Sequence, residues 1–188
     1  MTVISGPGTG SPETGSPVTG SPVTGSPETG GAGTASTGLS AEAASEVVTE
    51  FFHRYGAHDV EGMTELCAVN AGFSYVPFEI WGKQRVLRGD GKVGTVGKAI
   101  WTGFINSFPD FSNTVHTVSA NDAGDVVVEA DLGGTQRLPW GLTAPAGRHF
   151  SEPHLFVFHV GADRLIDSIT AYWDNAGISR QLGHNEVD

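Results

Sequence analysis

Apolar residues recur every three or four positions in three segments before residue 108, and this spacing predicts three helices. We expect the first helix to begin after Ser40, a good N-cap residue, and to end at Gly56. The second helix is expected at residues 60–67, with Asp59 as its cap, and the third at residues 94–107.

Beyond residue 108 the apolar period changes from about 3.6 to 2, which predicts strands. We expect four of them there and a short one before the third helix, at residues 73–78, 114–120, 126–136, 149–160 and 165–174. Helices followed by strands with short turns indicate an α+β domain, whose curved, mostly antiparallel sheet wraps over about three helices. Pro153 cannot donate to a ladder, so we expect the strand that contains it to be at an edge or bulged at its start.

The first 38 residues follow another pattern. From Thr9 to Gly30 the sequence repeats Thr, Gly, Ser and Pro with a period of five and has few apolar residues. Such a segment buries too little surface to offset its ordering entropy, so residues 1–38 are predicted to be a disordered tail. Residues 39–188 have the usual size of one domain.

Charge and composition exclude several functions. The formal net charge of −11 disfavours binding to nucleic acid, and no apolar run approaches the length of a membrane span. Cys67 is the only cysteine, and the first residues lack the features of a signal peptide, so we expect a cytoplasmic location. The histidines lack zinc spacing, and the Gly-rich segment 89–94 has no strand-and-helix context, so we expect a loop there, no metal and no cofactor.

A family resemblance appears in residues 154–183, HLFVFHVGADRLIDSITAYWDNAGISRQLG, and in the segments YGAHDVEGMTEL, SFPDF and GTQ. Together they resemble the SnoaL-like polyketide cyclases of the nuclear transport factor 2-like superfamily, which have a cone-shaped α+β fold. The resemblance implies a small hydrophobic substrate and a homodimer formed through the convex side of the sheet. The resemblance identifies the fold but says little about the reaction, because this fold hosts many activities.

The resemblance also implies where a catalytic pair would stand. The family's Asp on the last strand corresponds to Ala171, and its His on the preceding strand corresponds to Phe156. The family's usual acid/base pair is therefore absent, and an enzyme with this sequence needs other ionisable groups.

Asp174 has two interpretations. It directly precedes the helical run NAGISRQLG, where an N-cap belongs, and it has the opposite strand parity to Ala171. The cap interpretation is favoured over a catalytic one.

Strand parity gives better catalytic candidates. His154 and Glu152 share the face of Phe156, and a neutral His beside a carboxylate is a common general base. Glu129 and Asp131 share a face of the strand at 126–136; facing inward they would form an acid/base pair, and facing water they are a solvated surface.

Large aromatic side chains predict apolar walls for a substrate, although core packing is expected to claim about half of them. The predicted substrate-binding residues are Trp173, Phe156, Phe158, Trp101, Phe104, Tyr75 and Trp81.

Two functions stay open. One is a cofactor-independent enzyme of secondary metabolism that cyclises, isomerises or dehydrates a polyketide-like or other apolar cyclic substrate by acid/base catalysis. The other is a non-catalytic hydrophobic-ligand-binding or scaffold module.

Overall fold

The structure is a computed structural model that describes residues 38–78, 89–140 and 143–184. The predicted tail lies outside these residues except for Gly38, and so does Trp81.

The three predicted helices are confirmed and a fourth follows the last strand. The helices are α1 (Ala41–Gly56), α2 (Val60–Glu65), α3 (Lys98–Ser107) and α4 (Asn175–Leu182), and a π-helical turn, η1 (Val93–Gly97), leads into α3. Ser40 caps α1 by accepting from the N–H of Ala43, and Asp59 caps α2 by accepting from the N–H of Gly62. None of the helices described is long and apolar enough to cross a membrane.

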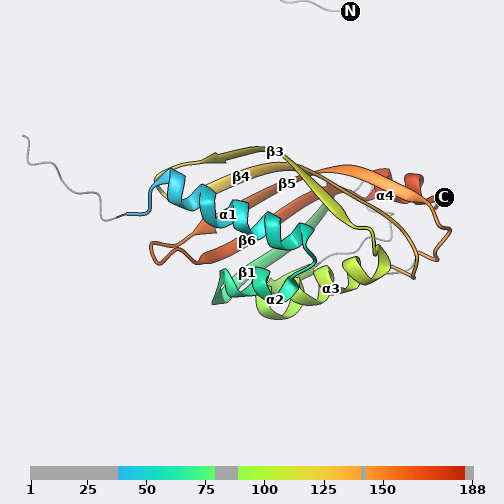
Figure 1. Cartoon of the computed structure of the whole chain (residues 1–188), viewed down its shortest axis with the longest axis horizontal. Coiled ribbons are helices and arrows are strands. Elements are labelled where there is room, and N and C mark those ends of the chain that lie inside the picture. The colour runs from blue at the N-terminus through green and yellow to red at the C-terminus, as the bar shows by residue number, and fades with distance from the viewer. Residues whose placement is uncertain (1–37, 79–88, 141–142, 185–188) are drawn as a thin grey trace, which may run out of the picture. The chain divides into compact units, whose positions relative to one another are not determined.

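Six strands form one curved sheet in the order β2-β1-β6-β5-β4-β3 (Figure 1). The strands are β1 (Cys67–Phe78), β2 (Gly89–Lys92), β3 (Ser112–Ala120), β4 (Asp125–Thr135), β5 (His149–Val160) and β6 (Ile166–Asp174). Among the strands of the described residues only β1 and β6 are parallel, so the predicted α+β class and mostly antiparallel sheet are confirmed.

Two local predictions were wrong, and a third holds only at the start of its strand. The Gly-rich segment 89–94 is not a loop, because its first four residues form β2 and pair with β1. Cys67 is not helical, because it begins β1. The strand with Pro153 is not at an edge, since β5 lies between β4 and β6, although its first five residues have only β4 as a strand neighbour.

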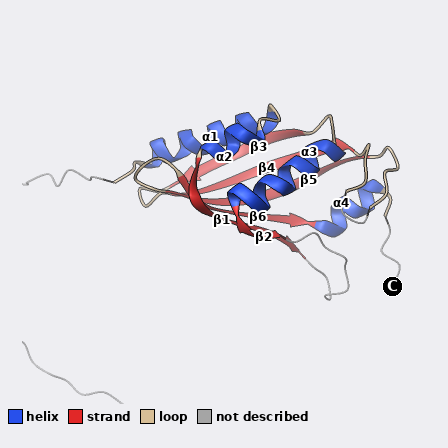
Figure 2. Cartoon of the chain, turned by 90° about the horizontal axis from the view of Figure 1, so that it is seen from below, coloured by secondary structure: helices blue, strands red, loops and turns tan. Residues whose placement is uncertain are grey.

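The sheet has a buried inner face and an exposed outer face. Alternate side chains of the central strands make up the inner face: Val126, Val128, Ala130 and Leu132 of β4, Phe150, His154, Phe156 and Phe158 of β5, and Ile169, Ala171 and Trp173 of β6. Helices α1 and α3 lie on this face (Figure 2), where the ring of Phe51 is 5.3 Å from that of Phe158 and 5.4 Å from that of Trp101.

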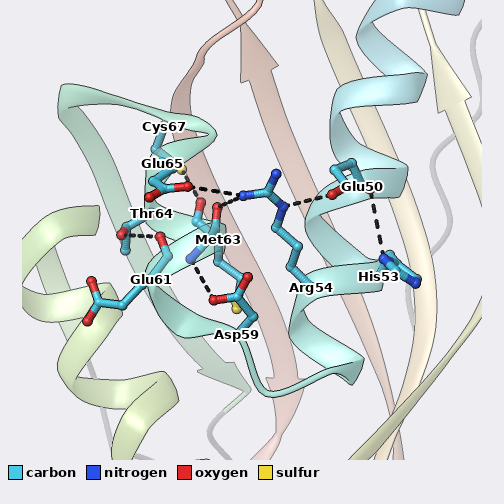
Figure 3. Close-up of polar contacts among 10 residues, drawn as sticks. Glu50, His53, Arg54, Asp59, Glu61, Met63, Thr64, Glu65 and Cys67 are labelled. Carbon is cyan, nitrogen blue, oxygen red and sulfur yellow. Dashed lines mark hydrogen bonds and ion pairs between the residues drawn. The ribbon is translucent and has the colours of Figure 1, made fainter.

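A group of polar residues, here called the Arg54 cluster, joins α1 to α2 (Figure 3). Arg54 donates to Glu50 at 2.7 Å and to the backbone carbonyl of Gly62 at 2.8 Å, and it pairs with Glu65 at 3.4 Å. The carboxylate of Asp59 accepts from the N–H of Gly62 beside it. The cluster fixes the turn between the two helices.

Candidate functional site

The two positions that the resemblance assigns to catalysis face each other. Phe156 and Ala171 are direct cross-strand partners on the inner face, and both are buried. Neither side chain can transfer a proton, so this pair is apolar packing.

The next cross-strand pair on the same face is His154 and Trp173. The His154 side chain is 3% exposed and the Trp173 side chain is completely buried. Their rings are nearly parallel, at 9°, with centroids 6.4 Å apart. Tyr75 of β1 stacks on the other side of Trp173 at 4.9 Å and 10°, and Phe156 stacks on His154 at 5.9 Å. Three neighbouring strands thus contribute one row of parallel rings.

The tautomer of His154 follows from its one hydrogen bond. Nδ1 lies 2.9 Å from the backbone carbonyl oxygen of Glu152. A carbonyl only accepts, so Nδ1 carries the proton, and in the neutral ring Nε2 is an acceptor with a free lone pair. Nε2 is buried and has no hydrogen-bond partner.

Burial keeps His154 uncharged. Loss of solvation lowers the pKa of His154 to about 4, against weaker opposing effects of the Glu152 carbonyl and of Asp131. At neutral pH the inner face therefore presents an unprotonated imidazole among aromatic rings.

Three other buried polar atoms of the described residues lack a partner: Nε1 of Trp173, Nδ2 of Asn175 and Oε1 of Gln136. Sequence reasoning missed Asn175 and Gln136 as site candidates. A signal existed for Gln136, which continues the inner-face parity of β4 beyond its last residue. No such signal existed for Asn175, because the buried face of α4 depends on how that helix packs.

Glu152 lies on the inner-face side of β5 but turns toward α4. Its carboxylate accepts from the side-chain amide of Gln181, whose oxygen in turn accepts from the N–H of Ser151. Gly177 makes room for it, because a Cβ at that position would overlap the carboxylate. Partial burial, followed by the nearby charge of Asp174, raises the pKa of Glu152. The carboxylate predicted to be the partner of His154 therefore has its hydrogen bond elsewhere.

Glu129 and Asp131 lie on the outer face, so of their two predicted roles they have that of a solvated surface. Glu129 accepts from Thr117 at 3.0 Å, and Asp131 is 3.0 Å from Nε2 of His116. The condition for their catalytic assignment, an inward orientation, is not met.

Asp174 stands at the N-cap position of α4, as expected, but its side chain makes no capping hydrogen bond. It lies on the outer side of β6, 3.8 Å from Arg180.

The predicted aromatic walls divide into two sets. Trp173 and Tyr75 belong to the row of rings around His154. Phe156 belongs to both sets, because its ring is 5.9 Å from that of His154 and 5.1 Å from that of Phe52 in α1. Phe158, Trp101 and Phe104 contact aromatic side chains of the helices or of the loop after α3, which is core packing. Trp140 connects the two sets, since its ring is 5.3 Å from that of Phe104 and 5.8 Å from that of Trp173.

No group of three potential metal ligands converges within the described parts of the chain. Cys67 is buried, and burial raises the pKa of its thiol to about 12, so it remains a protonated, unreactive side chain.

The sequence profile of the SnoaL-like domain matches residues 48–169. No curated protein sequence matches the chain significantly.

Solved structures with the nuclear transport factor 2-like fold superpose on the chain. AclR from Streptomyces galilaeus is 13% identical, with 79% of this chain and 89% of that one covered and a TM-score of 0.64. IdmH from Streptomyces antibioticus is 22% identical, with 74% and 98% covered and a TM-score of 0.58. SalBIII, an epoxide hydrolase/cyclase-like enzyme with a role in pyran ring formation in the polyether salinomycin, is 18% identical, with 72% and 94% covered and a TM-score of 0.54. At these identities the likeness establishes the fold.

Proposed function

Because the chain belongs to the SnoaL-like domain family, we propose that it is a cofactor-independent enzyme that moves a proton on a small apolar substrate, with His154 as the base. One observation carries the proposal: a neutral imidazole, fixed by its Nδ1–H, holds an unpartnered Nε2 in a buried aromatic setting. The proposal keeps the expected setting of secondary metabolism and of the cytoplasm. The neighbour SalBIII, whose described role is ring formation, supports it by analogy.

The proposed step is the same for cyclisation, isomerisation and dehydration. Nε2 of His154 takes a proton from a carbon beside a carbonyl group, and the electron pair of the broken C–H bond moves to the carbonyl oxygen. The enolate then attacks an electrophilic carbon, is reprotonated elsewhere or expels a β-hydroxyl group, and the imidazolium returns its proton. A base with a lowered pKa is weak, so an acidic proton, such as one between two carbonyls, suits it best.

The direct test measures deuterium exchange at C1 of 2-tetralone, an apolar enolisable ketone, in D2O by NMR. We expect the full chain to accelerate exchange and His154→Gln to lower the rate by about 10²- to 10⁴-fold. Glu129→Gln is the matched control, because it removes an ionisable group from the outer face and should leave the rate unchanged. Equal rates in the protein and in His154→Gln would remove His154 from the mechanism.

The alternative is a binding module without catalysis. One observation favours it: no carboxylate of the described inner-face residues bonds to His154, since Glu152 bonds to Gln181 while Glu129 and Asp131 face outward. In that case 2-tetralone would bind without exchange.

We also propose a homodimer formed through the outer face. This face carries partly exposed apolar side chains on its central strands, Val127 and Leu155, each 37% exposed. Val127→Glu would place a further negative charge beside Glu129 and is expected to dissociate the dimer in sedimentation velocity. A monomer at micromolar concentration in the unmodified protein would refute this interface.

A further inference from the structure

Nε2 of His154 and Nε1 of Trp173 have complementary hydrogen-bonding capacity. With Nδ1–H given to the Glu152 carbonyl, Nε2 of His154 can only accept. The indole Nε1–H of Trp173 can only donate. Both atoms are buried and both lack a partner, which is rare enough in native proteins to require an explanation.

The two nitrogens do not satisfy each other. The rings stack with planes only 9° apart, and an indole N–H points within its own plane rather than toward a stacked neighbour. His154 and Trp173 are cross-strand partners on the inner face, so their rings lie side by side there. A ligand that reaches both nitrogens meets one acceptor and one donor together.

We propose that the His154–Trp173 pair binds a neutral hydroxyl group on an apolar ring, as in an enol or a phenol. One hydroxyl oxygen donates to Nε2 of His154 and accepts from Nε1 of Trp173. A ketone or an ether would satisfy Trp173 alone and leave His154 unpaired. A carboxylate would direct negative charge at the lone pair of a neutral imidazole, so the pair selects against it.

Two features of the surroundings fit this ligand. The rings of Tyr75 and Phe156 extend the row on both sides, so the group that bears the hydroxyl contacts aromatic surface. Nδ2 of Asn175, two residues beyond Trp173, is another buried donor without a partner and can hold a second oxygen.

The test compares three ligands of one shape: 2-naphthol, 2-methylnaphthalene and 2-naphthoate. Affinities for the full chain are measured by NMR titration at pH 7, with the indole N–H signal of Trp173 as the reporter. Because an unmet hydrogen bond at a buried site weakens binding by about tenfold or more, 2-naphthol is expected to bind at least about tenfold more tightly than either other ligand.

Matched variants locate the effect. His154→Phe and Trp173→Phe should each reduce the preference of 2-naphthol over 2-methylnaphthalene to about twofold or less. Trp101→Phe makes the same change at a buried tryptophan outside the pair and should keep the preference. If Trp173→Phe does not fold, His154→Phe decides, with the Trp173 signal intact.

Three results would overturn the proposal: equal affinities for 2-naphthol and 2-methylnaphthalene, tighter binding of 2-naphthoate, or a Trp173 N–H signal that does not move at saturation. The inference rests on the site of the proposed enzyme but concerns binding alone. Hydroxyl selectivity without exchange of 2-tetralone would refute the enzyme and retain the hydroxyl site. Exchange of 2-tetralone without hydroxyl selectivity would retain the enzyme and refute the hydroxyl site.

Discussion

The Arg54 cluster and the His154–Trp173 pair are both polar groups set against an apolar core, but they differ in how their polar atoms are paired. Arg54 reaches two carboxylates and one backbone carbonyl from a partly exposed position at the surface. None of the four unpartnered buried atoms of the described residues belongs to that cluster, whereas two of them belong to the pair. A polar group that only stabilises a fold meets its partners within the fold, and a group that binds a ligand keeps its capacity free. The contrast supports a stabilising role for the first region and the proposed binding role for the second.

The largest expected effect that separates the regions is the acid sensitivity of His154. Its folded pKa of about 4 lies below the ordinary value of 6.5, so the unfolded chain takes up a proton first as the pH falls. This contribution to stability is complete above pH 6.5 and is lost progressively toward pH 4, by up to about 3 kcal/mol. Urea unfolding at pH 7 and pH 4 should show that His154→Phe loses correspondingly less stability than the unmodified protein.

His53 is the matched control for this measurement. It lies beside the Arg54 cluster with its side chain 79% exposed, so His53→Gln should reproduce the acid response of the unmodified protein. An identical loss of stability in His154→Phe and the unmodified protein would show that the imidazole of His154 is solvated.

Two helix glycines allow the same change to be made in both regions. A Cβ at Gly62 would overlap the carboxylate of Asp59, and a Cβ at Gly177 would overlap that of Glu152. Alanine improves helix propensity by about 1 kcal/mol. In Gly62→Ala this gain roughly offsets the lost cap. In Gly177→Ala it does not offset the lost contact of the Glu152 side chain with Gln181, so a net loss of about 1 kcal/mol is expected.

Thermal unfolding measures both glycine variants, and the signals of His154 in NMR spectra separate them further. Gly177→Ala should move these signals, because the backbone of Glu152 holds Nδ1. Gly62→Ala should leave them in place. Movement in Gly62→Ala would mean that the two regions are coupled.

Arg54→Met tests the stabilising role of the first region. It retains an apolar stem and removes every polar contact that joins α1 to α2 through Arg54. We expect the Tm to fall by about 2–4 °C and the affinity for 2-naphthol to stay constant. A weakened affinity at unchanged Tm would reverse the roles of the two regions.

Sequence pattern was sufficient for the α+β class and the three N-terminal helices. These features depend on local periodicity and on side-chain types at caps, which a sequence displays directly. The inward orientation of Phe156 and Trp173 was predicted from the family positions at 156 and 171, extended by strand parity. The pattern failed at the segment 89–94, where pairing with β1 outweighs the weak strand propensity of Gly.

The site was predicted only in part for a related reason. Parity, counted from the family position at Phe156, placed His154 on the buried face. The strand with Glu129 and Asp131 offered no such reference position, so parity could not decide which way these two side chains face. It also could not show that Glu152 bonds to Gln181, 29 residues away. Such contacts depend on how α4 packs on β5, and no local pattern encodes that packing.

The smallest expected effect concerns Asp174, which stands at an N-cap position but makes no capping hydrogen bond. Ser40 caps α1 with a hydrogen bond, so Ser40→Ala should cost about 1 kcal/mol. Asp174 occupies the same position on α4 without one, so Asp174→Asn and Asp174→Ala should each change the free energy of unfolding by no more than about 0.5 kcal/mol at pH 7. Asp174 instead acts on its neighbour, because its charge contributes to the raised pKa of Glu152. Removing that charge should lower the pKa of Glu152 toward its ordinary value, which a carbon-13 titration of the Glu152 carboxyl group measures. A loss of 1 kcal/mol or more, as in Ser40→Ala, together with an unchanged Glu152 titration, would show that Asp174 caps α4 in solution after all.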